Sequence, residues 1–200
     1  MRLLRDLKNL DADYILMDLG AGTSFNTLDF FLAADTQLLV AVPEPTSIEN
    51  AYRFIKSSFY RLIRLHSPTT ELRTFVEEAM DRNNQYGIRT PRELLAHLRS
   101  MGEEVEAFAN NLVEGYSPQL VLNQVRTASD IRVGNAMENA CLKYFGIYIE
   151  YRGFVHNHDA VRKSVLQRKP LMKLFPKEEV SEDLKRLLEN ILEQQKVPPS

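Results

Sequence analysis

The chain has 200 residues, of which 44% are hydrophobic and 26% charged, and its formal net charge is −2. These proportions are typical of a soluble globular protein and argue against a disordered chain or a generally basic nucleic-acid binder. No run reaches the ~20 apolar residues of a membrane span, and the amphipathic start lacks the apolar region of a signal peptide. We therefore expect a cytoplasmic protein whose single cysteine, Cys141, is a buried small hydrophobe.

The first part of the chain alternates strands with helices. A short apolar run predicts a buried strand over 14–18, and a helix over about 26–33 and an apolar strand over 37–42 follow. The order Thr46-Ser47-Ile48-Glu49 is typical of a capping box, which predicts a helix from there to about Leu65. This alternation favours a parallel sheet with helical crossovers.

A helical segment without strands then interrupts the alternation. Between residues 66 and 115 the apolar residues keep helical spacing, and Thr90-Pro91-Arg92-Glu93 is a second capping box. We expect this helical insertion either to pack over one sheet edge or to present a face to a protein partner. Because no linker composition separates it, we assign residues 1–200 to one domain.

The α/β pattern resumes after the insertion. The expected elements are a strand over 119–123, a helix over about 131–145 closed by Gly146, a strand over 147–151, a short helix with Asp159 as its N-cap, and a helix over about 179–195. The last helix has an acidic polar face, so we expect it to dock on the protein's own sheet rather than to anchor the chain to a membrane. The fold class that follows is α/β, with a parallel sheet flanked by helices.

The segment Asp18-Leu19-Gly20-Ala21-Gly22 places one carboxylate and two glycines at the carboxyl end of the first expected strand, where open parallel sheets bind ligands. By position alone, Asp18 either holds a magnesium ion through water or caps a turn. The segment resembles the switch segment of the MinD/ParA ATPases, a branch of the P-loop NTPases. Three later segments resemble that family in the same order, and the chain is most similar to its FlhG-like branch: Pro43–Ile48, Leu120–Val125 and Gly153–Leu171.

The resemblance implies ATP and magnesium as cofactors, and a protein that switches between an ATP-bound dimer and released states to position or regulate a cellular partner. The residues to which it gives a role are Asp18 for catalysis and for magnesium bound through water, Gly20, Ala21 and Gly22 for the switch turn, and Asn123, Val155 and His156 for the adenine site. An Asn amide offers both donors and an acceptor, which suits the adenine edge, although a polar residue also simply ends a strand. The stretch from Phe154 to Asn157 departs from the Ile-Pro that relatives often carry.

The family's ATP-binding loop, Lys-Gly-Gly-x-Gly-Lys-Thr/Ser, does not occur in the 200 residues. The leucines over 2–10 predict a helix that has no capping residue before it, so the chain opens in mid-helix. We therefore expect the carboxyl-terminal part of such an ATPase, inactive by itself and prone to self-association through exposed strand edges. The alternative is a non-catalytic protein-interaction module on the same scaffold.

Two further groups of residues carry chemistry. The basic residues Arg162, Lys163, Arg168, Lys169, Lys173 and Lys177 form either a solvated helix face or a patch for nonspecific nucleic-acid binding. The tract His156-Asn157-His158-Asp159 is a poor metal-binding set, because no other cysteine or histidine stands at ligand spacing from it.

Overall fold

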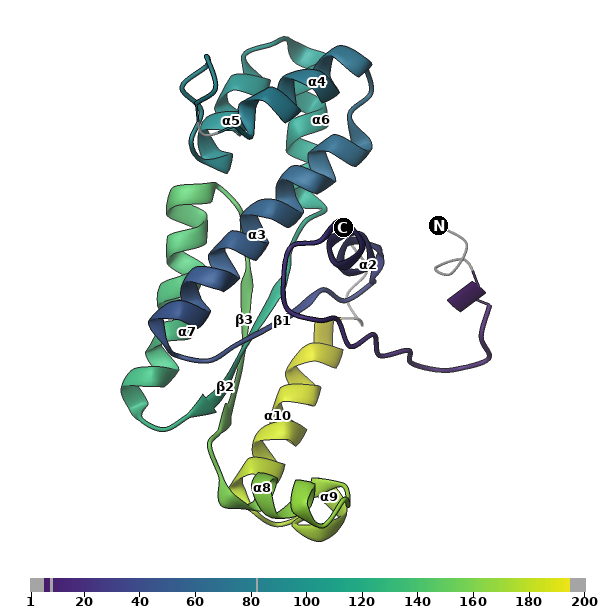
Figure 1. Ribbon diagram of the computed structural model, residues 1–200, viewed down its shortest axis with the longest axis vertical. Coiled ribbons are helices and arrows are strands. Elements are labelled where there is room, and N and C mark those ends of the chain that lie inside the picture. Colours follow the sequence, from purple (N-terminus) through teal and green to yellow (C-terminus); the bar gives the residue numbers. More distant parts are fainter. Residues whose placement is uncertain (1–5, 8, 82, 195–200) are drawn as a thin grey trace. The chain divides into compact units, whose positions relative to one another are not determined.

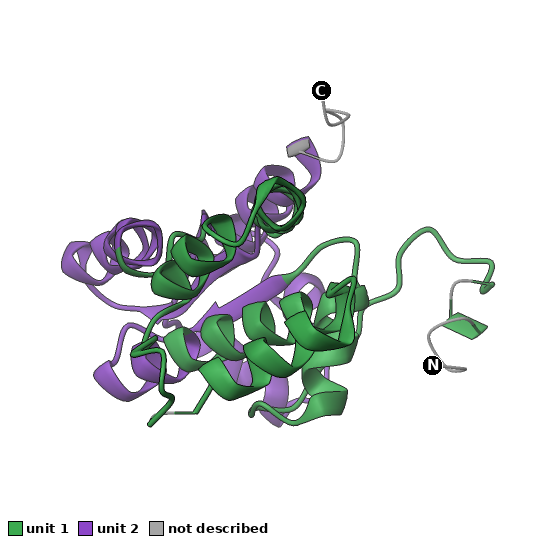
Figure 2. Cartoon of the chain, turned by 90° about the horizontal axis from the view of Figure 1, so that it is seen from above, with its two compact units in different colours: residues 1–37, 52–116, 144–147 green, residues 38–51, 117–143, 148–200 purple. Residues whose placement is uncertain are grey.

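The structure is a computed structural model that describes residues 6, 7, 9–81 and 83–194 (Figure 1). The chain divides into two compact units, which Figure 2 distinguishes by colour. The first unit comprises residues 1–37, 52–116 and 144–147, and the second comprises residues 38–51, 117–143 and 148–200. Most of the helix predicted over 2–10 lies outside the described residues. The assignment of the whole chain to one domain stays a prediction.

A three-stranded parallel sheet forms the centre of the second unit. Its strands are β1 (Leu38–Ala41), β2 (Gln119–Val125) and β3 (Glu150–His156), in the spatial order β1-β2-β3. The apolar residues of β2 from Leu120 to Leu122 are at most 2% exposed, as the middle strand of a covered parallel sheet requires. The α/β class and the parallel sheet flanked by helices are therefore confirmed.

Helices of the second unit cover this sheet. They are α7 (Ala128–Ala140), the first three residues of a π-helical turn (Cys141–Phe145), α8 (Asp159–Leu166), α9 (Leu171–Leu174) and α10 (Glu179–Gln194). Helix α7 packs on β2 and β3, and α10 packs on β3, where Val180 is fully buried against Val155 and Ala160 (Figure 1). The docking of the last helix on the sheet is thus confirmed. Cys141 is buried as expected, and burial raises the pKa of its thiol to about 12.

The last strand differs from the one predicted over 147–151, because β3 runs from Glu150 to His156. Gly153, which lies beyond the predicted strand, is inside β3. Arg152 is an extra residue in the ladder, since Leu120 pairs with Tyr151 and the next pair joins Val121 to Gly153. The backbone of Gly153 has φ +134°, which only glycine adopts readily, so the glycine permits the bulge instead of ending the strand.

The first unit is helical in its regular structure. Its helices are α2 (Phe25–Ala33), the part of α3 (Pro45–His66) that begins at Tyr52, α4 (Thr70–Ala79), α5 (Pro91–Arg99) and α6 (Glu103–Glu114). Their apolar faces meet in a core in which Phe59, Ile63 and Leu94 are fully buried. The described part of residues 66–115 holds no strand, as predicted, and the capping box of Thr90 and Glu93 is present.

Three predictions for local structure are wrong. Residues 14–18 form no strand and lie largely exposed, with Leu16 at 92%. An apolar run becomes a strand only when another strand completes its hydrogen bonds, and among the described residues none pairs with it. Helix α3 begins at Pro45, so Thr46 lies inside the helix, and His158 rather than Asp159 caps α8. No helix in the described parts of the chain combines the length and apolarity needed to cross a membrane.

Candidate functional site

The carboxyl ends of β2 and β3 bring together three of the residues that the sequence singles out. Leu122 pairs with Phe154 and Val125 pairs with His156, so Asn123 and Gln124 together face the single residue Val155. Gln124 takes a left-handed conformation with φ +59°, and its N–H donates to the Asn123 side-chain oxygen over 2.9 Å. The resulting bulge leaves the amide nitrogen of Asn123 without a partner among the described residues. Parallel sheets present their ligand sites at this edge.

His156 is held at the same edge by a carboxylate from α10. Asp183, only 3% exposed, accepts the backbone N–H of His156 over 3.0 Å and lies 2.8 Å from its imidazole Nδ1. Because the ionised carboxylate only accepts, the shared hydrogen resides on Nδ1. In the neutral imidazole the other ring nitrogen, Nε2, then carries a lone pair, and no described residue pairs with it on this side chain, which is 25% exposed.

Val155, the third of these residues, points elsewhere. Its side chain is 8% exposed and packs in the cluster with Ala160 and Val180. Its contribution to a ligand site is therefore limited to its backbone, while Asn123 and His156 supply the polar side chains. Phe154 stacks edge-on against the His156 ring with centroids 5.0 Å apart, which adds an apolar wall beside the imidazole.

The helix that follows β2 is capped by its own residues. Thr127 accepts from the N–H of Asp130, and Asp130 accepts from the N–H groups of Arg126 and Thr127, each over 2.9 Å. The backbone N–H of Arg126 is the main cause that lowers the pKa of the Asp130 carboxyl. The Asp130 carboxylate thus binds the two amides that precede α7, and this capping box fixes the turn between β2 and the helix.

Asp18 and the turn from Gly20 to Gly22 belong to the first unit. Asp18 is exposed, and Gly22 has a φ of +126° that a residue with a side chain would adopt only with strain. A Cβ atom at Gly20 or Gly22 would meet no atom within 4 Å, so the turn is not packed against a neighbour. Ser24 accepts from the N–H of Thr27 and caps α2.

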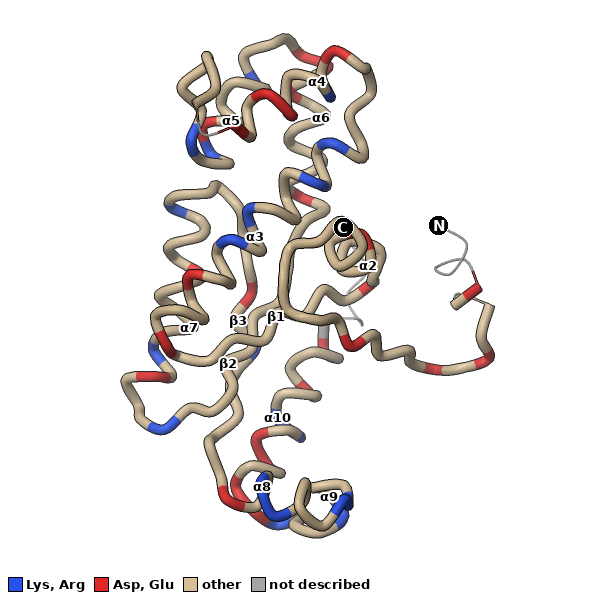
Figure 3. The backbone as a smooth tube through the Cα atoms, in the orientation of Figure 1, with Lys and Arg blue, Asp and Glu red and all other residues tan. Residues whose placement is uncertain are grey.

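The described residues contain no candidate metal cluster, and the six basic residues singled out in the sequence form no ion pair among them. The described parts of the chain contain no group of three His, Cys, Asp or Glu residues able to hold a metal ion, and Asp18 stands outside any such group. His158 faces Glu178, directly before α10, over 3.5 Å, and His156 faces Asp183 of α10, so both histidines of the tract lie beside acids. The six basic residues of α8, α9 and their flanks are exposed and gather at one end of the second unit (Figure 3).

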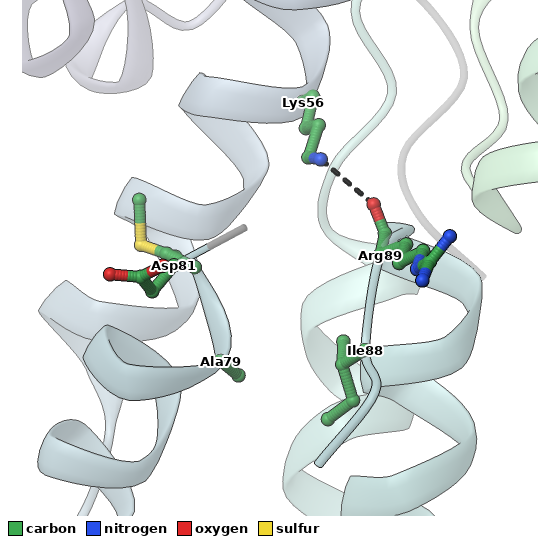
Figure 4. Close-up of a pocket in the computed structure, with 6 residues that line it drawn as sticks. Lys56, Ala79, Asp81, Ile88 and Arg89 are labelled. Atoms are coloured by element: carbon green, nitrogen blue, oxygen red, sulfur yellow. Dashed lines mark hydrogen bonds between the residues drawn. The ribbon is translucent and has the colours of Figure 1, made fainter. Parts of the chain in front are cut away.

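A pocket of about 310 Å³ lies in the first unit, between α3, the end of α4 and the segment before α5 (Figure 4). It is lined by Lys56, Ala79, Met80, Asp81, Ile88 and Arg89. Lys56 Nζ donates to the carbonyl oxygen of Arg89 over 2.9 Å. The lysine therefore forms part of the pocket wall through a hydrogen bond within the protein. None of the lining residues is one to which the sequence gives a role.

The chain matches no protein-family model, and no curated protein matches it.

Asp183 is the residue of this edge that sequence reasoning missed. By composition it belongs with the acids on the polar face of the last helix, but it is buried. A signal was present, because Asp183 stands three residues after Val180 and four before Leu187, on the apolar stripe of α10. A carboxylate in such a stripe needs a polar partner within the protein, and His156 provides it.

Proposed function

We propose that this chain supplies the base-binding and switch segments of an ATP-dependent switch protein similar to the MinD/ParA ATPases. In the complete protein, ATP and Mg²⁺ would bridge a dimer, and hydrolysis would release it from a cellular partner. The observation that carries the proposal is that Asn123 and His156 lie on the adjacent strands β2 and β3, both at the carboxyl edge of a parallel sheet.

Each residue has a distinct role in this proposal. The Asn123 amide, which keeps its nitrogen free of described partners, donates to the adenine ring, and the Nε2 lone pair of His156 accepts from the exocyclic amine. Asp18 orders the water shell of Mg²⁺, and the backbone of Gly20 to Gly22 forms the turn that responds to the terminal phosphate. Val155 holds the strand end in place.

The chain lacks the loop that would hold a triphosphate. A triphosphate owes most of its affinity to backbone amides and a lysine of a glycine-rich loop, which the 200 residues do not contain. We therefore expect the chain by itself to bind ATP weakly and not to hydrolyse it.

The first prediction concerns Asn123→Ala. Titration with adenosine or ATP, followed by amide NMR, should shift the signals of Asn123, Gln124 and His156 in the native chain. Loss of one base-directed hydrogen bond, about 1 kcal/mol, should raise the Kd roughly fivefold in the variant. Asn139→Ala is the matched control, because Asn139 is exposed on α7 and its amide donates only to the Asn135 carbonyl oxygen within its own helix.

Guanosine supplies the discriminating ligand. It carries an acceptor oxygen at C6, where adenosine carries the amine from which the His156 lone pair would accept, so it should shift these signals less than adenosine does. Equal shifts for the two nucleosides, or an unchanged Kd in Asn123→Ala, would contradict the proposed base site. No shift with any nucleotide would favour the alternative, a protein-interaction module without nucleotide chemistry.

The second prediction concerns self-association. Strand β1 pairs only with β2 among the described strands, and Val40 on it is 56% exposed. A free strand edge with an exposed β-branched residue pairs readily with another chain. We expect the native chain to form dimers or larger species in light scattering, and Val40→Lys to shift them toward the monomer.

Leu188→Lys provides the matched control for this change. Leu188 is 55% exposed on helix α10, so its backbone takes no part in strand pairing. It adds the same charge at the same exposure. A native chain that is monomeric at all concentrations, or equal effects of the two lysines, would show that the β1 edge is not used.

A further inference from the structure

The segment from Asp159 to Lys177 forms a basic end of the second unit. It carries six cations and a single acid, Asp159, for a formal charge of +5 in a chain of net charge −2. The cations are Arg162, Lys163, Arg168, Lys169, Lys173 and Lys177, and Figure 3 shows them on and around α8 and α9. All six are exposed, and none forms an ion pair with a residue in the described parts of the chain.

Large apolar side chains are exposed among these cations. Val165 is 69% exposed and Leu166 is 70% exposed at the last turn of α8, directly before Arg168 and Lys169. Met172 on α9 is 39% exposed. Arg168, in a left-handed conformation with φ +51°, reverses the chain between α8 and α9, so Val165 and Leu166 lie next to the tip of a short helical hairpin.

The hairpin is anchored, so this exposure does not come from a loose segment. Leu171 and Phe175 pack on the buried cluster of Val155, Ala160 and Val180. Ser181 Oγ donates to the Phe175 carbonyl oxygen over 2.6 Å, which joins the end of the hairpin to α10. The apolar tip is therefore presented by a fixed base.

Four acids at the start of the neighbouring helix α10 and directly before it do not neutralise the basic end. Glu178 faces His158 over 3.5 Å, and Asp183 and Glu179 face His156 over 2.8 and 3.6 Å. Glu182 pairs with Lys185 over 2.6 Å. Each of these acids is directed to a group outside the six cations, which leaves the six available to an external anion.

We propose that the α8–α9 tip binds the surface of an anionic lipid bilayer. Val165 and Leu166 enter the boundary between headgroups and acyl chains, and the surrounding cations contact the lipid phosphates and carboxylates. A nucleic acid would satisfy the cations but offers no apolar phase for aliphatic side chains, and the exposed apolar residues of the tip include no aromatic ring on which a base could stack. This inference does not depend on the proposed nucleotide site.

The test is co-sedimentation of the full chain with vesicles made of equal parts phosphatidylcholine and phosphatidylserine. Val165→Gln with Leu166→Gln should weaken binding about tenfold, because both side chains lose their transfer into the apolar boundary. Arg168→Gln with Lys169→Gln should weaken it by about tenfold or more. Both double variants should keep the native circular dichroism and unfolding midpoint, since all four side chains are exposed.

Matched changes elsewhere in the second unit provide the controls. Leu188→Gln removes an equally accessible apolar side chain from α10, and Arg132→Gln with Arg186→Gln removes two exposed cations. These variants should bind the vesicles as the native chain does, and no variant should bind phosphatidylcholine alone.

Two results would overturn the proposal. One is failure of the native chain to sediment with the anionic vesicles at low salt. The other is a loss of binding in the cation variant with none in the Val165/Leu166 variant, because charge attraction alone would then account for it. Gel-shift titration with duplex DNA completes the test, and DNA binding at lower concentration than vesicle binding would assign the patch to nucleic acid instead.

Discussion

Replacing Gly134 with alanine should destabilise the second unit by about 2 kcal/mol, the middle of the range for overpacked cores. The glycine lies on α7 beneath the ring of Tyr151, and a Cβ atom there would overlap three ring atoms, the most distant of which, Cδ2, is 2.5 Å away. The gain of about 1 kcal/mol that alanine normally brings inside a helix is too small to offset this overlap.

Urea unfolding followed by circular dichroism measures this effect. Gly20→Ala is the matched control, because a Cβ there meets nothing within 4 Å and should leave the unfolding midpoint nearly unchanged. The cause is tested in a Tyr151→Leu background, in which the alanine should cost far less. An equal cost in both backgrounds would show that the ring is not what excludes a side chain at position 134.

The contact between the Tyr151 ring and Gly134 is not supported by a hydrogen bond of the tyrosine hydroxyl. The hydroxyl is buried without a hydrogen-bond partner, and burial raises the pKa of the phenol to about 12. A buried hydroxyl that lacks a partner costs free energy. Van der Waals contact with Gly134, and not a hydrogen bond of the hydroxyl, therefore holds the ring in place. A side chain at position 134 would prevent this contact.

The sequence predicted those elements whose local residue pattern favours the same structure as their packing in the folded chain. The strand at 119–123 was predicted from its apolar run, and β2 extends it only to Val125. The capping box at Thr90 was predicted from four adjacent residues and is present, because a cap is decided within one turn. Helix α10 was predicted from its apolar stripe.

The parts that were not predicted depend on residues distant in the chain. The run over 14–18 has the composition of a buried strand, but it has no partner strand among the described residues and so forms none. The bulge at Arg152 depends on the register of β3 against β2, which no local pattern encodes. At the candidate site, the position of Asn123 near a strand end was predicted. The hydrogen bonds by which Asp183 holds His156 on the adjacent strand were not predicted.

The largest expected effect in the first unit is that of Asp29→Ala, which should lower its stability by about 3 kcal/mol. Asp29 on α2 is 6% exposed, and its two carboxylate oxygens accept from Nε and Nη2 of Arg61 over 2.7 and 2.9 Å. The hydrogen bonds with Asp29 raise the pKa of the guanidinium, which stays charged at every accessible pH. Removing the carboxylate would leave this charge 16% exposed, with the Phe25 ring 4.8 Å away as its neighbour.

A second ion pair, between α3 and α4, shows how much a charge pair contributes when it is not buried. Arg64 and Glu77 meet at 2.5 Å, but their side chains are 35% and 44% exposed, so Glu77→Ala should cost no more than about 0.5 kcal/mol. The double change Asp29→Leu with Arg61→Leu should recover most of the stability lost in Asp29→Ala, because it removes the stranded charge together with its partner. If urea unfolding gave equal losses for Asp29→Ala and Glu77→Ala, the pair would contribute through surface attraction alone. A double variant no more stable than Asp29→Ala would show instead that the geometry of the two hydrogen bonds, and not the unpaired charge, holds α2 to α3.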